Sequence, residues 1–171
     1  VGLELTKPVT DKKAMEFNIT NEMGVDDRIR FIKNVAGMWL LEESLDYWAS
    51  KGENYTAAEL AKAAAELPCA SVIDANDPIF EKPGAMPERI AMLCEKSNQQ
   101  VPQSPAAYAR CIFDSLADAY VKVLAQLQSA AEVKINAINI VGGGSANRLL
   151  NQLTADATGL PVYAGPSEAT V

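Results

Sequence analysis

The sequence lacks several features on which common enzyme mechanisms depend. Its 171 residues contain no histidine, which excludes the Ser-His-Asp and Cys-His mechanisms and removes the commonest zinc ligand. Cysteine is scarce, and Cys69, Cys94 and Cys111 are too widely spaced for a CxxC metal site or a disulfide framework. We therefore predict three reduced thiols in the core, no metal site and no hydrolase chemistry within this chain.

Positive charge and long apolar runs are also scarce. Fifteen Lys and Arg residues stand against 22 Asp and Glu, a net charge of −7, and no basic cluster is present, so no nucleic-acid partner is expected. The longest apolar runs, 35–41 and 135–141, are far shorter than the roughly 20 residues that cross a bilayer. With no signal peptide at the start, we predict a soluble, cytoplasmic protein without a membrane partner.

The length and the apolar share of the sequence set the expected domain organisation. With 49% apolar residues, the chain can bury one sizeable core but hardly two, so residues 1–171 are predicted to form a single domain. The sequence starts at Val1 without a methionine and ends at Val171 without a helix stop or a polar tail. We expect it to be truncated at both ends.

Hydrophobic spacing and turn residues predict helices and short strands in the first three quarters of the chain. Val1–Leu5 and Ala14–Thr20 are expected to pair as a hairpin, and apolar spacing from Asp27 to Trp48 predicts a largely buried helix. Three further helices are predicted, starting at Thr56 with a Thr56/Glu59 capping box, at Pro87, and at Ser104 for about seven turns.

The last quarter contains a glycine turn between a predicted buried strand at Ile135–Val141 and a helix at Ala146–Thr158, with a further strand at Val162-Tyr163. Bare backbone after a strand, facing the positive end of a helix, suits a phosphate or a nucleotide. Gly142-Gly143-Gly144-Ser145 is neither a Walker A loop nor a dinucleotide fingerprint, because the residues that those motifs require do not follow. Glycines at such a turn can also serve only tight packing.

The residues around this turn resemble a known family. Residues 140–153, continuing through 155–162, resemble the adenosine motif of the FGGY carbohydrate kinases, and residues 164–170 resemble the segment that follows it. Within that family, four stretches resemble the C-terminal half of rhamnulokinases: 17–22, 28–34, 37–41 and 109–116. The resemblance covers essentially the whole chain.

The resemblance implies a helix-rich α/β fold of the ribonuclease H-like type found in actin-like ATPases, in which two domains close on ATP and sugar. This chain would be most of the C-terminal, nucleotide-binding domain, and its partner would be the N-terminal domain of the same kinase. The implied reaction uses ATP and Mg²⁺ to convert a ketose, L-rhamnulose for rhamnulokinases, to its 1-phosphate. The general-base Asp is expected upstream of Val1, so the fragment alone is expected to be inactive.

Five residues acquire site roles from the resemblance. Gly142 and Gly143 belong to the adenosine motif, with Gly143 against the adenine or ribose, unless it is only a packing glycine. Asn147 is expected to hydrogen-bond the nucleotide, although its side chain could instead cap backbone groups. Asn34 is expected near the sugar or the cleft between the domains, with an internal hydrogen bond as the alternative. Glu42 stands where rhamnulokinases present a glutamine toward ATP, and its carboxylate would repel phosphates unless a metal or Lys intervenes.

Two other functions compete with an L-rhamnulose kinase. One keeps the family but changes the sugar to L-fuculose or D-xylulose, because substrate choice is expected to lie largely outside this chain. The other is a noncatalytic helical interaction module that docks a partner through the helix around Trp39 and the long helix from Ser104. Nucleotide binding distinguishes the interaction module from both kinases.

Overall fold

The computed structural model describes residues 1–166 of the chain, which contain both helices and strands. The elements in chain order are β1 (Gly2–Leu5), α1 (Lys12–Glu16), β2 (Thr20–Met23), β3 (Ile29–Ile32), α2 (Trp39–Ser50), α3 (Ala57–Ala65), the 3₁₀ helix η1 (Pro78–Phe80), α4 (Met86–Lys96), α5 (Pro105–Ala131), β4 (Ile138–Ile140), the 3₁₀ helix η2 (Gly143–Ala146), α6 (Arg148–Thr158) and β5 (Val162–Ala164). The predicted α/β class is confirmed, and helices supply most of the regular structure.

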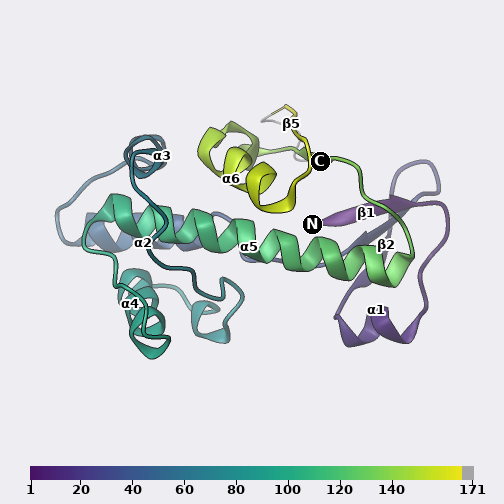
Figure 1. The fold of residues 1–171 in the computed structure, drawn as a ribbon, viewed down its shortest axis with the longest axis horizontal. Helices are drawn as coiled ribbons and strands as arrows, with labels where there is room; N and C mark the ends of the chain where they lie inside the picture. The colour runs from purple at the N-terminus through teal and green to yellow at the C-terminus, as the bar shows by residue number, and fades with distance from the viewer. Residues whose placement is uncertain (167–171) are drawn as a thin grey trace.

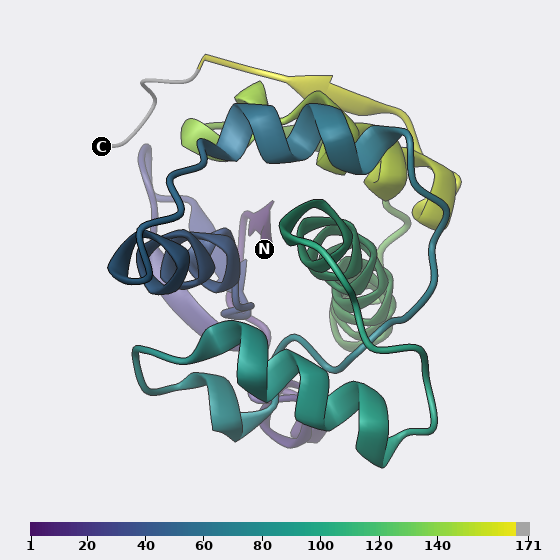
Figure 2. The ribbon, with the colours of Figure 1, turned by 90° about the vertical axis from the view of Figure 1, so that its left-hand side faces the viewer.

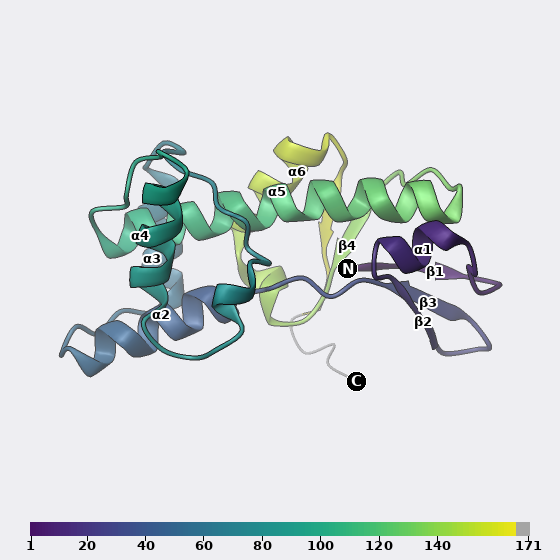
Figure 3. The same ribbon diagram turned by 90° about the horizontal axis from the view of Figure 1, so that it is seen from below.

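Helix α5 runs the length of the molecule and organises the elements around it (Figure 1). Its 27 residues begin after Ser104, whose side chain accepts a hydrogen bond from the Ala107 N–H at 3.2 Å, with Pro105 in the first turn. The predicted cap and length are therefore confirmed. Helices α2, α3 and α4 surround its N-terminal half (Figure 2), whereas α1 and the three-stranded sheet lie at its C-terminal half (Figure 3).

Two clusters of buried side chains lie along α5. The larger joins α2, α3, α4, α5 and α6, and its fully buried members include Leu40, Phe113 and Leu116. The smaller lies between α1, the three-stranded sheet and α5, around Phe31 and Leu127. Because α5 contributes to both clusters, each depends on the same helix for its packing surface. That arrangement agrees with the single-domain prediction, which remains a prediction.

The predicted N-terminal hairpin is wrong. Residues 12–16 form α1, whose N-terminus is capped by Asp11: its carboxylate accepts from the Lys13 N–H at 3.0 Å. Strand β1 pairs antiparallel with β3, and β3 also pairs antiparallel with β2, giving the order β1-β3-β2. The local cap and the burial of Ala14 against the smaller cluster favour a helix where strand-like composition suggested a strand.

The predicted helix from Asp27 to Trp48 is correct only in its second half. Residues 29–32 form the central strand β3, and residues 33–38 connect it to α2. Asp26 and Asp27 both have positive φ angles, 53° and 55°, as in the turns that close tight β-hairpins. Pairing with strands on both sides outweighs the helical spacing. Trp39 is also 39% exposed, so the prediction of a largely buried segment fails there.

The C-terminal part follows the predicted order of strand, turn, helix and strand. Strands β4 and β5 pair in parallel, with Ile138 opposite Val162, and α6 connects them while packing on α5. The predicted strand at 135–141 shortens to three residues, and it is half-exposed rather than buried. The reason is that, within the described part of the chain, β4 has a strand partner on one side only.

Within residues 1–166, none of the helices combines the length and the apolar character that crossing a bilayer requires. Residues 167–170 of the segment that resembles the family lie outside the described residues.

Candidate functional site

The glycine turn lies between β4 and α6, and its two ends are held by backbone hydrogen bonds. Gly142 has a φ of +79°, a conformation that L side chains rarely adopt. Its N–H donates to the Pro166 carbonyl at 3.0 Å, and its own carbonyl accepts from the Ser145 N–H at 3.0 Å and the Ser145 hydroxyl at 2.8 Å. Gly142 therefore shapes the turn, and its polar groups are already used within the protein.

Gly143 and Gly144 have open space around them. Gly143 is exposed, and a Cβ atom added to either glycine would meet no atom within 4 Å. The packing explanation for these two glycines therefore has no contact to support it. What remains is bare backbone beside the start of α6, where the N–H groups of Arg148 and Leu149 have no carbonyl partner within the helix. Such a surface attracts a polar or anionic group.

The sequence prediction placed Asn147 on the first turn of the helix, but in the structure it is the N-cap of α6. Its Oδ1 accepts from the Leu150 N–H at 3.1 Å, so the capping alternative describes this oxygen correctly. Its Nδ2 lies 4.0 Å from the sulfur of Met38. One end of the side chain is therefore fixed by the helix, while the Nδ2 group has only this weak partner and can still bind a ligand.

The contact between Asn147 and Met38 brings the start of α6 against the start of α2. Met38 is the N-cap of α2, and Glu42 lies exposed in the first turn of that helix. Among residues 1–166, the Glu42 carboxylate takes part in no ion pair, and no neighbouring Lys offsets its charge. Asn147 and Glu42 thus belong to adjoining helix starts, but Glu42 offers no attraction for phosphates.

Asn34 lies apart from this arrangement. It is exposed in the connection between β3 and α2, and in the described structure its side chain makes no hydrogen bond, so the internal hydrogen bond considered from the sequence is absent. Among the described residues, no hydrogen bond joins it to the glycine turn. Its proposed role toward the sugar remains a prediction.

Asn151 is a residue of the site that the sequence prediction missed. From the second turn of α6, its Nδ2 donates to the Ser145 carbonyl at 2.9 Å, which ties the helix back to the glycine turn. Its Oδ1 is buried and has no partner among the described residues. The signal for it was a polar residue four positions after Asn147, where the helix repeat places both on one face.

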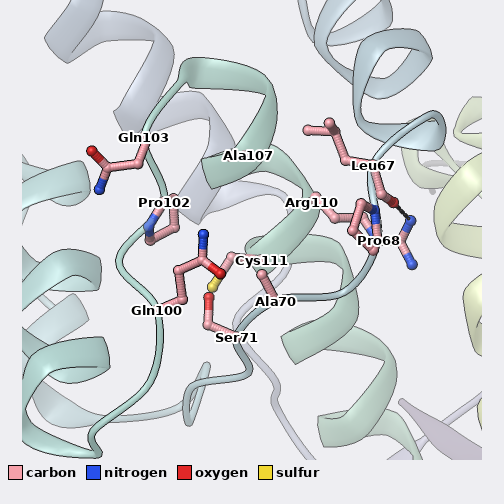
Figure 4. Close-up of a pocket in the computed structure, with 10 residues that line it drawn as sticks. All are labelled: Leu67, Pro68, Ala70, Ser71, Gln100, Pro102, Gln103, Ala107, Arg110 and Cys111. Carbon is pink, nitrogen blue, oxygen red and sulfur yellow. Dashed lines mark hydrogen bonds between the residues drawn. The ribbon is translucent and has the colours of Figure 1, made fainter.

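A cavity of about 180 Å³ lies elsewhere, between the end of α3 and the first turns of α5 (Figure 4). Its walls include Pro68, Pro102 and the stem of Arg110, and none of the predicted site residues lines it. The Arg110 guanidinium points out of it toward the Leu67 carbonyl, and its Nε donates to Asp114 at 2.8 Å. With its charged group paired, the cavity offers little to recognise a ligand.

The titratable groups of the described residues give no sign of a metal centre. Across residues 1–166, no group of three His, Cys, Asp or Glu side chains is placed to hold a metal ion. The three cysteines are free thiols. Cys94 and Cys111 are buried, but the prediction of a core position is wrong for Cys69, which is exposed. Burial raises the pKa of the Cys111 thiol to about 12, and burial followed by a hydrogen bond with Asp114 raises the pKa of Cys69, so neither is an activated nucleophile.

Comparison with known proteins finds one family and relatives that share a single name. Residues 1–171 match the family described as "FGGY family of carbohydrate kinases, C-terminal domain". The chain is 44% identical over 171 residues to a rhamnulokinase of Mannheimia succiniciproducens, covering 100% of this chain and 35% of that protein. It is 38% identical over 170 residues to a rhamnulokinase of Halalkalibacterium halodurans, with 99% and 36% covered. The chain thus spans about a third of the length of the curated relatives it matches.

Proposed function

The chain belongs to the C-terminal domain family of the FGGY carbohydrate kinases, and from this premise we propose that it supplies the adenosine-binding half of an ATP-dependent ketose kinase. The proposed reaction is the conversion of L-rhamnulose to L-rhamnulose 1-phosphate. The observation that carries the proposal is the match of the whole chain to rhamnulokinases at about 40% identity. As an expectation of family membership, the fold is ribonuclease H-like and the reaction takes place in the cytoplasm.

The glycine turn supports the nucleotide part of this proposal. Open space at Gly143 and Gly144 lets a flat group approach the backbone, and the first turn of α6 adds two N–H groups and the positive end of a helix dipole. In this arrangement Gly143 faces the adenine or the ribose, Gly142 sets the turn, and the Asn147 amide donates to the nucleotide. Glu42 and Asn34 are assigned weaker roles at the edge of the cleft.

The chemistry itself is proposed to need groups from outside this chain. ATP, when bound, supplies the γ-phosphoryl group, and its transfer depends on a base for the sugar hydroxyl and on neutralisation of phosphate charge. The residues described here contain neither a metal cluster nor an activated carboxylate at the glycine turn. We propose that an Asp of the N-terminal domain is the base, that Mg²⁺ is held outside these residues, and that this chain orients the nucleotide.

The test is ADP release by the full-length enzyme that carries this chain. The assay supplies Mg²⁺ and ATP with L-rhamnulose, L-fuculose or D-xylulose in turn. Turnover stimulated most by L-rhamnulose supports the proposal in full, whereas stimulation by another ketose keeps the kinase and replaces its sugar. If no sugar stimulates turnover and ADP does not bind, the kinase assignment is wrong and a noncatalytic interaction module replaces it.

A further inference from the structure

We propose that Asn151 is a positioning residue that holds the glycine turn in the conformation that binds nucleotide. The inference rests on the proposed function for what the turn binds, but the hydrogen bonds that lead to it belong to the described structure. Asn151 is distinct from the predicted ligands because it acts on Ser145 and not on the nucleotide.

Asn151 lies at the end of a short chain of hydrogen bonds. Its Nδ2 donates to the Ser145 carbonyl at 2.9 Å, and the Ser145 hydroxyl and N–H donate to the Gly142 carbonyl at 2.8 and 3.0 Å. Ser145 is only 6% exposed. Through these bonds α6 fixes both residues that flank Gly143 and Gly144.

The chemistry of the Asn151 side chain points to its amide donor as the group that matters. The Oδ1 atom is buried without a partner in the described structure, which is unfavourable for folding. Asparagine is also a poorer helix former than leucine. A leucine at this position would remove the unpaired oxygen, but it would leave the Ser145 carbonyl without its donor. The amide at position 151 therefore stabilises the glycine turn, whereas the helix itself would be more stable with leucine.

The consequence concerns the entropy of nucleotide binding. A Cβ atom added to Gly143 or Gly144 would meet no atom within 4 Å, so no packing contact restrains this side of either residue. Their conformation depends on the two anchored residues beside them and on the Gly144 carbonyl, which accepts from the Asn147 N–H at 3.1 Å. When the Ser145 anchor is lost, the two glycines sample more conformations, and binding has to select one of them. Affinity for the nucleotide falls, while bound ATP reacts at its usual rate.

The experiment replaces Asn151 in the full-length enzyme with leucine and, separately, with alanine. The matched control is Thr154→Val on the same helix, because the Thr154 hydroxyl is buried and, within residues 1–166, bonds only to the Leu150 carbonyl of its own helix, at 2.7 Å. The Kd of ADP with Mg²⁺ is measured by calorimetry, and KM and kcat by turnover. Exchange of the Ser145 and Asn147 amides, which donate to the Gly142 and Gly144 carbonyls, is measured by mass spectrometry.

The expected result is that both Asn151 variants raise the Kd of ADP about five- to tenfold, the effect of one lost hydrogen bond. Exchange of the Ser145 and Asn147 amides becomes faster, KM for ATP rises with Kd, and kcat stays at the wild-type value. Asn151→Leu melts no lower than wild type, so affinity and stability separate. Thr154→Val leaves the Kd and the exchange of the Ser145 and Asn147 amides unchanged.

The inference is overturned by an Asn151→Leu variant with wild-type ADP affinity, or by one whose Ser145 and Asn147 amides exchange at the wild-type rate. A loss of affinity that always follows a loss of melting temperature, in Thr154→Val as in the Asn151 variants, also overturns it. If wild type binds no ADP at all, the proposed function fails instead. The exchange measurement still decides whether Asn151 anchors the turn.

Discussion

Neighbouring glycines serve different purposes in this protein. Gly142 is required by its backbone angle, since a φ of +79° disfavours any side chain. Gly143 lies in open space without a positive φ, so nothing in the protein itself requires a glycine there. Substitutions at the two positions should therefore separate the stability of the turn from its capacity to bind.

The first prediction uses this contrast. We expect Gly143→Leu to leave the melting temperature unchanged and to weaken ADP binding at least tenfold, because the leucine fills the space proposed for the nucleotide. Gly142→Ala is the companion variant, and we expect it to lower the stability of the turn by about 1 kcal/mol because alanine is strained at positive φ. Calorimetric titration with ADP and thermal unfolding are the two measurements. Wild-type affinity in Gly143→Leu would argue against a nucleotide at this turn.

The second prediction concerns the thiols. Cys69 is exposed, whereas Cys94 and Cys111 are buried. Peptide mapping after brief iodoacetamide treatment of the native protein should find Cys69 alkylated and the other two intact, with all three alkylated in denaturant. Because the pKa of Cys69 is raised above its ordinary value of 9.0, its alkylation rate should still be increasing above pH 9. A rate that levels off below pH 9 would contradict the raised pKa.

The sequence could predict some of the site residues but not their arrangement. The motif around Gly142 to Asn147 is continuous along the chain, so its place at a strand-to-helix turn follows from local pattern. The contact of Asn147 with Met38 joins residues 109 positions apart and cannot be read from spacing. The positions of Asn34 and Glu42 relative to the glycine turn also depend on contacts between residues distant in sequence. Their proposed roles remain predictions.

At the scale of elements, helices with local start signals were predicted well, whereas only some of the strands were: β1 and β5 lie where the sequence predicted strands, but β3 was missed. The Thr56 capping box and the Ser104 cap hold as predicted, because caps involve residues three positions apart. Strand β3 was missed because it pairs on both sides, with β1, which is distant in sequence, and with β2 across the turn at Asp26 and Asp27, whose residues did not signal a hairpin in the sequence. Strand β4 was predicted too long and too buried, because burial depends on what lies beside a strand.

The third prediction tests the cap of α3. The Thr56 hydroxyl accepts from the Glu59 N–H at 3.2 Å and donates to the Glu59 carboxylate at 2.7 Å, and the Thr56 N–H donates to the same carboxylate at 2.9 Å. Thr56→Ala should lower the stability of α3 by about 1 kcal/mol. This loss of stability should be measurable as faster hydrogen exchange of the α3 amides. Exchange at the wild-type rate would mean that α3 is held by packing alone.

The same cap predicts a pH dependence. The hydrogen bonds from the Thr56 hydroxyl and then from its N–H hold the pKa of Glu59 below its ordinary value of 4.5. The stabilisation is therefore fully present above pH 4.5 and is lost as the pH falls through the lower folded pKa. In wild type, protection of the α3 amides should decline over this acid range. In Glu59→Gln the cap-dependent part of that decline should disappear.

At the scale of the whole molecule, one helix joins two buried clusters. Phe113 belongs to the larger cluster and Leu127 to the smaller, and both are fully buried on α5. Val35 packs against both clusters from the connection before α2. If residues 1–166 unfold as one cooperative unit, a substitution that destabilises one cluster should also lower the stability of the other.

The last prediction tests this cooperativity. Phe113→Ala should cost about 3–5 kcal/mol and Leu127→Ala about 2–5 kcal/mol, because each leaves a cavity in a packed core. In a single cooperative unit, each variant accelerates the slowest exchange of amides in α4 and in β3 by the same factor, since those amides exchange only when the whole unit opens. Lys122→Ala is the control, because this exposed residue of α5 should change stability by less than about 0.5 kcal/mol. The alternative result is that Phe113→Ala accelerates exchange in α4 alone and Leu127→Ala accelerates exchange in β3 alone. The two clusters would then open independently, and α5 would connect two units without coupling their stabilities.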